Sequence, residues 1–356
     1  MYDVKIIKAP VLKNKPQDET QLGFGKIFSD HMLLIEYNEG VGWHDARVTP
    51  LTNLSLHPAS SVLHYSQEIF EGAKCYRGEN GMKLFRIRDN FERMNRSAAR
   101  MGMATMPIEL YMESLMALLS VDKEWTPHQE GTSLYIRPTM IATKPYLGVS
   151  ASDSYLYYVL LSPSGAYYSG GLAPVGIYVE DELVRAVRGG VGDAKTGGNY
   201  SASILAGIKA KKLGYAQVLW LDGVQQRYVE EVGAMNMMFV YEGKKIVTPA
   251  LNGSILSGIT RDSTLKLANY LGFETEEKSL AIDDVIADAK SGRITEAFGT
   301  GTAAVISPVN KIHFKGQDVL IGDDSIGPVA RKLYDTLTGI QYGKVNDPFQ
   351  WVTNVP

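Results

Sequence analysis

The sequence predicts an α+β protein built from two domains. Its 356 residues exceed the length of a typical single domain. In both halves, segments that resemble antiparallel hairpins mix with helical segments, whereas a parallel α/β fold would repeat strand, helix, strand. A stretch rich in glycine, serine and proline, Ser162–Pro174, lies between the halves and is typical of a linker. We therefore expect a smaller N-terminal domain at 1–165, a linker at 166–176 and a larger C-terminal domain at 177–356.

The N-terminal half is expected to begin with an arm and to continue with strands. The first 20 residues are polar and rich in lysine, so we expect a loosely held arm. Residues 31–50 predict a strand, a turn and a second strand. Residues 73–86 predict a hairpin, because Glu79-Asn80-Gly81 is a sequence typical of a turn and lies between two apolar runs. Two further strands are expected at 133–142 and 154–163.

Two helices are expected in the same half. Asp89 is the predicted N-cap of the first helix, and Gly102 ends it. The apolar residues between them recur at helical spacing on one face: Phe91, Met94, Ala98 and Met101. The second helix covers about residues 109–121.

The C-terminal half mixes hairpins and helices in the same way. After a strand near 175–182, hairpins are expected at 217–232 and 236–249. Asp222-Gly223 lies between the two apolar runs of the first hairpin and is typical of its turn. Helices are expected near 201–212, 260–271, 281–289 and at the C-terminus, with a glycine-rich segment at 294–309 before the last one.

Composition and charge exclude several classes of protein. The net charge is −3 and no basic stripe is visible, so no nucleic-acid partner is expected. Cys75 is the single cysteine, which rules out an internal disulfide and a cysteine zinc cluster. No apolar stretch reaches the length of a membrane span, and the first 20 residues contain no apolar core of signal-peptide length. We expect a cytoplasmic protein without a metal or a membrane partner.

The segment "GGVGDAKTGGNY", Gly189–Tyr200, places Lys195 among five glycines. It is not a good phosphate loop, because Ala194 occupies a position where that loop requires glycine. The dinucleotide-binding pattern also fails, since its third glycine would fall on Lys195. A glycine-rich surface turn with a solvated lysine, a nucleotide-binding ATPase and a non-catalytic binding module are the alternatives to a chemical role for Lys195.

That chemical role is a covalent bond to an aldehyde, for which pyridoxal phosphate is the commonest partner. Such a cofactor also needs an anion cradle and a carboxylate for its ring nitrogen. Gly258-Ile259-Thr260, at the predicted start of a helix, could hold a phosphate. Glu230 or Glu231 could supply the carboxylate, although either could be a solvated charge. The turn at 299–304 could offer backbone amides, or be only a tight turn.

Taken together, these features resemble the branched-chain amino acid aminotransferases, a family of fold-type-IV pyridoxal phosphate enzymes. The similarity runs through nearly the whole chain, and seven motifs occur in the order and at the spacing of the family. They are "LHYSQEIFEGAKCYRG", "LFRIRDNFERMNRSAARM", "GTSLYIRPTMIAT", "GVGDAKTGGNY", "EEVGAMN", "LNGSILSGITRDS" and "FGTGTAAVISPV". The resemblance implies an α/β N-terminal domain and a C-terminal domain with a β-barrel-like core.

The resemblance also assigns residues to the cofactor pyridoxal 5′-phosphate. Lys195 is implied to bond to its aldehyde, and Tyr200 to donate to its ring oxygen. Glu231, rather than Glu230, matches the carboxylate that faces the ring nitrogen. The positions that match phosphate or cofactor contacts are Arg93, Ile259, Thr260 and Thr302.

The substrate site implied by the resemblance is apolar and aromatic. Its lining matches Phe24, Tyr65, Phe70, Tyr135 and Tyr167. The substrate carboxylate is implied to bind the turn amides of Thr302 and Ala303, and Arg137 matches an arginine near the entrance. Val149 matches a residue that reaches into the neighbouring subunit's site, which implies a homodimer.

The implied activity is reversible amino transfer between leucine, isoleucine or valine and 2-oxoglutarate. After the substrate amine displaces Lys195, the freed lysine is the general base that moves the Cα proton to the cofactor. The chain departs from the family at two places. Ala304 and Ser307 stand where mammalian members carry a redox cysteine pair, so that thiol switch is absent. Ala234 replaces a threonine that some members place near the substrate.

Overall fold

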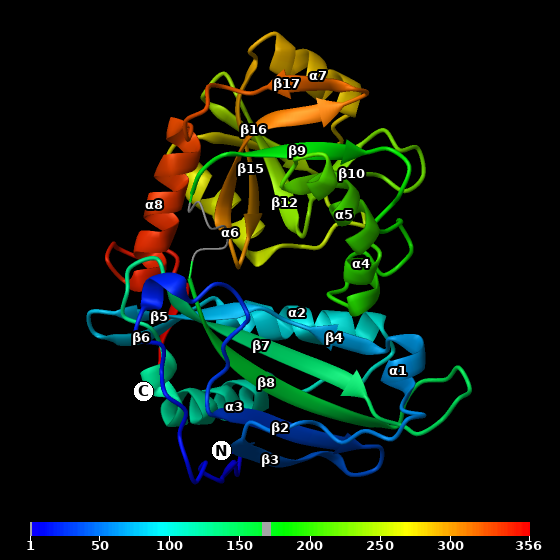
Figure 1. Cartoon of the computed structure of the whole chain (residues 1–356), viewed down its shortest axis with the longest axis vertical. Helices are drawn as coiled ribbons and strands as arrows, with labels where there is room; N and C mark the ends of the chain where they lie inside the picture. The colour runs from blue at the N-terminus through cyan, green and yellow to red at the C-terminus, as the bar shows by residue number, and fades with distance from the viewer. Residues whose placement is uncertain (1, 166–171) are drawn as a thin grey trace. The chain divides into compact units, whose positions relative to one another are not determined.

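The computed structural model describes residues 2–165 and 172–356, and it divides the chain into two compact units (Figure 1). The first unit comprises Met1–Ser169, Ala194–Gly197 and Gly339–Pro356, and the second comprises Gly170–Asp193 and Gly198–Thr338. The chain therefore returns to the first unit twice, once at Lys195 and once at its C-terminus. The domain limits expected from the sequence, at 165 and 177, include neither return and remain a prediction.

The first unit contains a mixed sheet whose described strands follow the order β1-β3-β2-β8-β7-β5-β6-β18, with β4 paired to β7. Strands β2, β8 and β7 are long antiparallel neighbours and lie side by side in Figure 1. The strands span Lys5–Ile6 (β1), His31–Asn38 (β2), Gly42–Pro50 (β3), Glu68–Phe70 (β4), Ala73–Gly78 (β5), Gly81–Phe85 (β6), Ser133–Ala142 (β7), Ser154–Ser164 (β8) and Val352–Asn354 (β18). The expected hairpin and both expected later strands are present.

Apolar side chains of one sheet face pack against two helices of this unit. The helices are α2 (Ile87–Arg100) and α3 (Ile108–Val121), and α1 (Ser61–Tyr65) is shorter; 3-10 turns occupy Glu19–Gln21 (η1) and Lys123–Trp125 (η2). Phe91 of α2 and Tyr111 of α3 stack at 4.6 Å within this core. Burial of such large aromatic surfaces is the main force that holds the helices on the sheet.

Two local expectations for this unit are wrong. Arg86, not Asp89, is the N-cap of α2, and Asp89 lies in the first turn, where its carboxylate accepts from Arg86 Nε at 2.5 Å. The acidic side chain stabilises the start of the helix from inside the first turn. The N-terminal arm is also fixed: β1 pairs with β3, and the Ala9 N–H donates to Nε2 of the buried His31.

The second unit is organised around a closed barrel. Neighbouring strands follow the order β11-β10-β9-β16-β15-β12, and β11 also pairs with β12, which closes a ring of six. The strands span Val175–Glu180 (β9), Gln217–Leu221 (β10), Val229–Val232 (β11), Met235–Tyr241 (β12), Lys245–Pro249 (β13), Glu274–Lys278 (β14), Ile294–Gly301 (β15), Val305–Phe314 (β16) and Gln317–Leu320 (β17). This is the α+β fold with a barrel-like core that the resemblance implies.

Helices and turns complete the barrel unit. The helices are α4 (Gly197–Ser201), α5 (Ile204–Lys212), α6 (Ile259–Tyr270), α7 (Ile282–Lys290) and α8 (Pro328–Tyr342). The expected turn at Asp222 joins β10 to β11, and the Asp222 carboxylate accepts backbone N–H groups from four residues of that turn. Among the residues that the structure describes, no helix has the length and apolar character of a membrane span.

Candidate functional site

The segment Ala194–Gly197 is held against the first unit on both sides of Lys195. The Lys195 N–H donates to Ser97 Oγ of α2 at 2.9 Å, and its carbonyl accepts from Phe70 N of β4 at 3.0 Å. The Thr196 hydroxyl donates to the Glu68 carbonyl at 2.7 Å. These bonds fix the main chain at Lys195, so the position of the amine depends only on its own side chain.

The Lys195 amine lies in a cluster of predicted site residues around the Phe70 ring. Lys195 Nζ is 4.9 Å from the ring centroid, and the Arg137 guanidinium carbon is also 4.9 Å from it. Arg137 Nη2 donates to the Tyr135 hydroxyl at 3.0 Å, and Phe24 meets the Tyr135 ring edge-on at 4.8 Å. The first unit thus brings five of the expected residues together in an aromatic setting with two cations.

Arg93 forms a buried ion pair with Glu71, a residue that follows β4. Glu71 is fully buried, and its carboxylate accepts from Arg93 Nε at 2.7 Å and from Arg93 Nη2 at 2.9 Å. Asn90 Nδ2 and the Gly72 N–H also donate to this carboxylate. Burial alone would raise the pKa of Glu71, but the charge and hydrogen bonds of Arg93, with smaller effects from Lys195 and Asn90, hold it below its ordinary value.

Glu231 lies in β11 of the second unit and is nearly buried. Its Oε1 accepts the Leu256 N–H at 2.9 Å, and its Oε2 is 3.1 Å from Nε of Arg185, which is also buried. Glu230 serves a different purpose: its carboxylate accepts from Asn252 and from the Ser254 hydroxyl, and so fixes the turn before α6. Glu231 is therefore the carboxylate that an arginine holds in place.

Helix α6 begins at the expected anion cradle. Gly258 is its N-cap, and Ile259 and Thr260 are buried in its first turn. A Cβ at Gly258 would collide with Asn236 Oδ1, so any larger residue would force the Asn236 amide to move. The N–H groups at the start of a helix attract anions. Thr300 Oγ1 of β15, which is opposite Asn236 in the sheet register, is buried without a hydrogen-bond partner among the described residues.

Three more expected residues, Thr302, Ala303 and Tyr200, lie in a turn and a short helix of the second unit. Thr302 and Ala303 are half-buried in the turn from β15 to β16. Tyr200 is half-buried in α4, directly after Asn199, whose side-chain amide donates to the Val191 carbonyl at 2.7 Å. That bond closes the glycine-rich segment onto itself.

Three expected residues remain: Tyr65, Val149 and Tyr167. Tyr65 ends α1 and is 41% exposed, and its hydroxyl donates to the Leu147 carbonyl. Leu147 belongs to the loop that carries Val149, which is 85% exposed. Tyr167 lies outside the described residues.

Comparisons with known proteins identify the family of the chain. The model of the family "Amino-transferase class IV" matches residues 68–312, which is more than half of the chain. The chain is 52% identical over 350 residues to "Branched-chain-amino-acid transaminase 1" of Bacillus subtilis, and this match covers 98% of both chains. The chain belongs to the branched-chain class IV aminotransferases.

Solved structures of such aminotransferases share the fold. The branched-chain amino acid aminotransferase of Escherichia coli superposes with a TM-score of 0.77 at 28% identity, over 92% of this chain and 99% of that one. The branched-chain aminotransferase of the thermophilic archaeon Thermoproteus uzoniensis, solved with norvaline, gives a TM-score of 0.75 at 27% identity, over 91% of this chain and 100% of that one. The resemblance found in the sequence motifs is confirmed.

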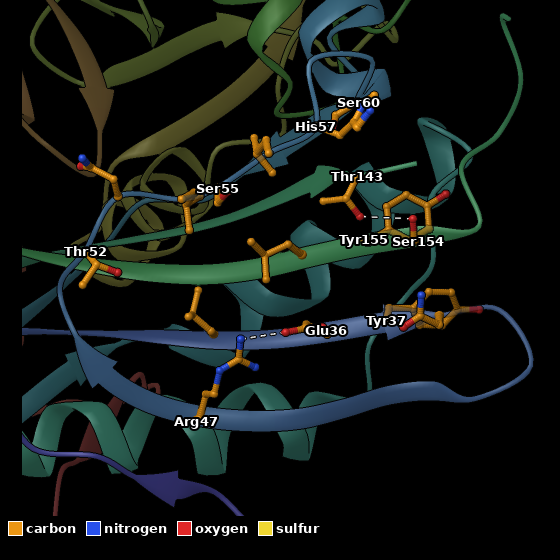
Figure 2. A pocket seen from close by; sticks show the side chains of 16 residues that line it. Glu36, Tyr37, Arg47, Thr52, Ser55, His57, Ser60, Thr143, Ser154 and Tyr155 are labelled. Atoms are coloured by element: carbon orange, nitrogen blue, oxygen red, sulfur yellow. Dashed lines mark hydrogen bonds and ion pairs between the residues drawn. The ribbon is translucent and has the colours of Figure 1, made fainter. Parts of the chain in front are cut away.

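The aminotransferase also has a surface pocket of about 380 Å³ that contains none of the expected site residues (Figure 2). It lies in the first unit over β2, β3 and β8, and residues of the segment 52–57 line it. Arg47 and Glu36 form an ion pair in it at 2.7 Å, and the Thr143 hydroxyl donates to Ser154 Oγ at 3.2 Å. Its charges are already paired, so we assign it no part in the reaction.

Four residues around the expected site of the aminotransferase were not predicted from the sequence: Ser97, Glu68, Glu71 and Arg185. Ser97, Glu71 and Arg185 contact the expected residues Lys195, Arg93 and Glu231, and the Glu68 carbonyl accepts from Thr196, the neighbour of Lys195. Glu71 and Arg185 are charged residues next to apolar or glycine-rich stretches, which is a weak sign of a buried ion pair. Glu71 pairs with a residue on the helix that follows, and Arg185 pairs with a residue on a distant strand, so neither pairing could be read from local pattern.

Proposed function

We propose that this aminotransferase moves the amino group between leucine, isoleucine or valine and 2-oxoglutarate, with Lys195 as the residue that bonds to the cofactor and later moves the proton. The observation that carries the assignment is the fixed main chain at Lys195. It is bonded on both sides to α2 and β4, and it holds the amine over the Phe70 ring. A lysine on a solvated surface turn would have no such bonds.

Class IV aminotransferases use pyridoxal 5′-phosphate, and the chemistry of the donors in this chain fits that group. The start of α6 offers main-chain amides and the Thr260 hydroxyl to a phosphate. Glu231, nearly buried and 3.1 Å from the guanidinium of Arg185, suits a protonated ring nitrogen. When bound, the cofactor supplies an aldehyde for the amino group and an electron-accepting ring.

The residues of the chain then have separate tasks. Arg93, Ile259, Thr260 and Thr302 would hold the phosphate and ring. Tyr200 would donate to the ring oxygen, and Glu231 would keep the proton on the ring nitrogen. Lys195 would be the general base that takes the proton from the substrate Cα. Because the main chain of Lys195 is fixed, the amine can move only by rotation about the bonds of its own side chain.

Dual substrate recognition is proposed to depend on Arg137. Its guanidinium lies against the rings of Phe70 and Tyr135, and its buried Nε makes no hydrogen bond within the described residues. Aromatic surfaces accept a branched apolar side chain, while the same guanidinium can pair with the carboxylate of glutamate. Phe24, Tyr65 and Tyr167 complete the proposed apolar lining, and the amides of Thr302 and Ala303 bind the substrate α-carboxylate.

We also propose a cytoplasmic homodimer. Val149 and Leu147 are 85% and 63% exposed on one loop, and the Tyr65 hydroxyl supports that loop. Apolar residues this exposed on a supported loop favour burial against a partner. The proposed partner is a second copy of the chain, whose site the Val149 loop would complete.

The visible spectrum of the purified enzyme and its activity on a substrate panel test the function. We expect a yellow protein whose chromophore is fixed to Lys195 by borohydride. We also expect turnover of leucine, isoleucine and valine with 2-oxoglutarate, but not of D-alanine. Lys195→Ala is expected to retain cofactor non-covalently and to lose turnover. A protein that stays colourless with added pyridoxal phosphate, or a Lys195→Ala variant with substantial activity, would refute the assignment.

A further inference from the structure

Arg185 makes a buried contact with the carboxylate of Glu231. The side chains are only 6% and 5% exposed, and Arg185 Nε lies 3.1 Å from Glu231 Oε2. Arg185 Nη2 donates to the Ser254 carbonyl at 2.5 Å, which anchors the guanidinium. The Nε–H makes no hydrogen bond of good geometry within the described residues, so the contact with Glu231 is an ion pair rather than a directed bond.

The other oxygen of Glu231 is held by neutral donors. Glu231 Oε1 accepts the Leu256 N–H at 2.9 Å and lies 3.4 Å from Asn236 Nδ2. These contacts orient the carboxylate but add no charge. Arg185 brings a full positive charge to the side chain at 3.1 Å in a setting from which water is largely excluded.

A proton shared between a carboxylate and a ring nitrogen can rest on either group. A guanidinium beside the carboxylate stabilises the form in which the carboxylate is ionised and the nitrogen carries the proton. The guanidinium would also repel a protonated ring, but it contacts the carboxylate directly, and a ring nitrogen that bonds to this carboxylate would be farther from the guanidinium than the carboxylate is. The attraction to the carboxylate is therefore the larger effect, because the energy falls with distance.

We propose that Arg185 is a positioning residue for Glu231, whose charge keeps that carboxylate ionised so that the proton stays on the cofactor's ring nitrogen. The inference rests on the proposed role of Glu231. Loss of the charge weakens the electron-accepting ring, which slows proton removal at Cα more than it weakens substrate binding. A residue that only stabilised the barrel would affect folding and cofactor content, but not the protonation of the bound ring.

The test uses holoenzyme reconstituted with pyridoxal phosphate that carries 15N in its ring. In Arg185→Gln we expect the ring 15N signal to move toward the unprotonated position. We expect kcat to fall by about tenfold or more with a smaller change in KM. Arg185→Lys, which keeps the charge, is expected to restore most of the wild-type signal. Arg185→Met gives the same direction as Arg185→Gln and replaces it if that variant does not fold.

Two further variants separate the possible failures. Lys209→Met removes the cation 3.4 Å from buried Glu180, elsewhere on the barrel, and is expected to leave the 15N signal unchanged. If Glu231→Gln moves the signal while Arg185→Gln and Arg185→Met leave it at the wild-type position, the inference about Arg185 is wrong and the role of Glu231 stands. If Glu231→Gln also leaves the signal unchanged, the proposed role of Glu231 is wrong, and the inference falls with it.

Discussion

Replacement of Glu71 by alanine is expected to destabilise the first unit strongly. The fully buried carboxylate receives two bonds from Arg93, at 2.7 and 2.9 Å, and one each from Asn90 and Gly72. Without it, a guanidinium remains buried with its main counter-charge gone. Removal of one partner from a buried ion pair costs about 3–5 kcal/mol. At about 2–4 °C per kcal/mol, Tm is expected to fall by on the order of 10 °C.

Glu71→Gln keeps the volume and one acceptor oxygen but loses the charge, so we expect an intermediate loss of about 2 kcal/mol. The pKa of Glu71 lies below its ordinary value of 4.5 in the folded state. The stabilisation by the charge is therefore present above that pH and is lost as the pH falls through the lowered folded pKa. The difference in stability between wild type and Glu71→Gln is expected to shrink in acid.

The assay is urea unfolding of the cofactor-free protein at several pH values, followed by circular dichroism. The matched control is Glu109→Ala, which breaks an exposed pair with Arg88 and is expected to leave the midpoint unchanged. The reasoning is refuted if Glu71→Ala shifts the unfolding midpoint no more than Glu109→Ala does. It is also refuted if the effect of Glu71→Gln grows as the pH falls below the ordinary value of 4.5.

Three further predictions concern other parts of the chain. Gly192→Ala should lower stability by about 1–3 kcal/mol in urea unfolding, because its Cβ would collide with the Ser254 carbonyl oxygen, whereas Gly198→Ala meets open space and should cause no loss. Cys75 is buried and its pKa is raised to about 12, so a thiol reagent should react only after unfolding; reaction in native protein would contradict this. Asp222→Ala removes the acceptor for four turn N–H groups and should lower the free energy of unfolding by about 1 kcal/mol in the same assay. Equal unfolding midpoints for this variant and the wild type would contradict the prediction.

Much of the proposed chemistry could be predicted from the sequence because it depends on local residue types. A lysine among glycines, a Gly-Ile-Thr helix start and a carboxylate pair within "VEEVG" each have a recognisable pattern. The hairpins and most helices followed from periodicity and turn residues. The N-cap of α2 was predicted about one turn too late. The true N-cap, Arg86, has a left-handed backbone conformation, which the sequence does not reveal because arginine is not a typical residue at that position. The arm was expected to be loose because composition does not reveal its bond to His31.

The sequence by itself determined the α+β class and the family, and it singled out Lys195 for the proposed covalent role, since these follow from residue types in order along the chain. The tertiary structure alone decided how those residues are held. It showed that β11 pairs with β12 to close the barrel, that Glu71 holds Arg93, and that Arg185 faces Glu231. The physical reason is that a buried charge needs a partner, and the fold can supply that partner from a distant part of the chain. The local sequence around either residue does not reveal the pairing.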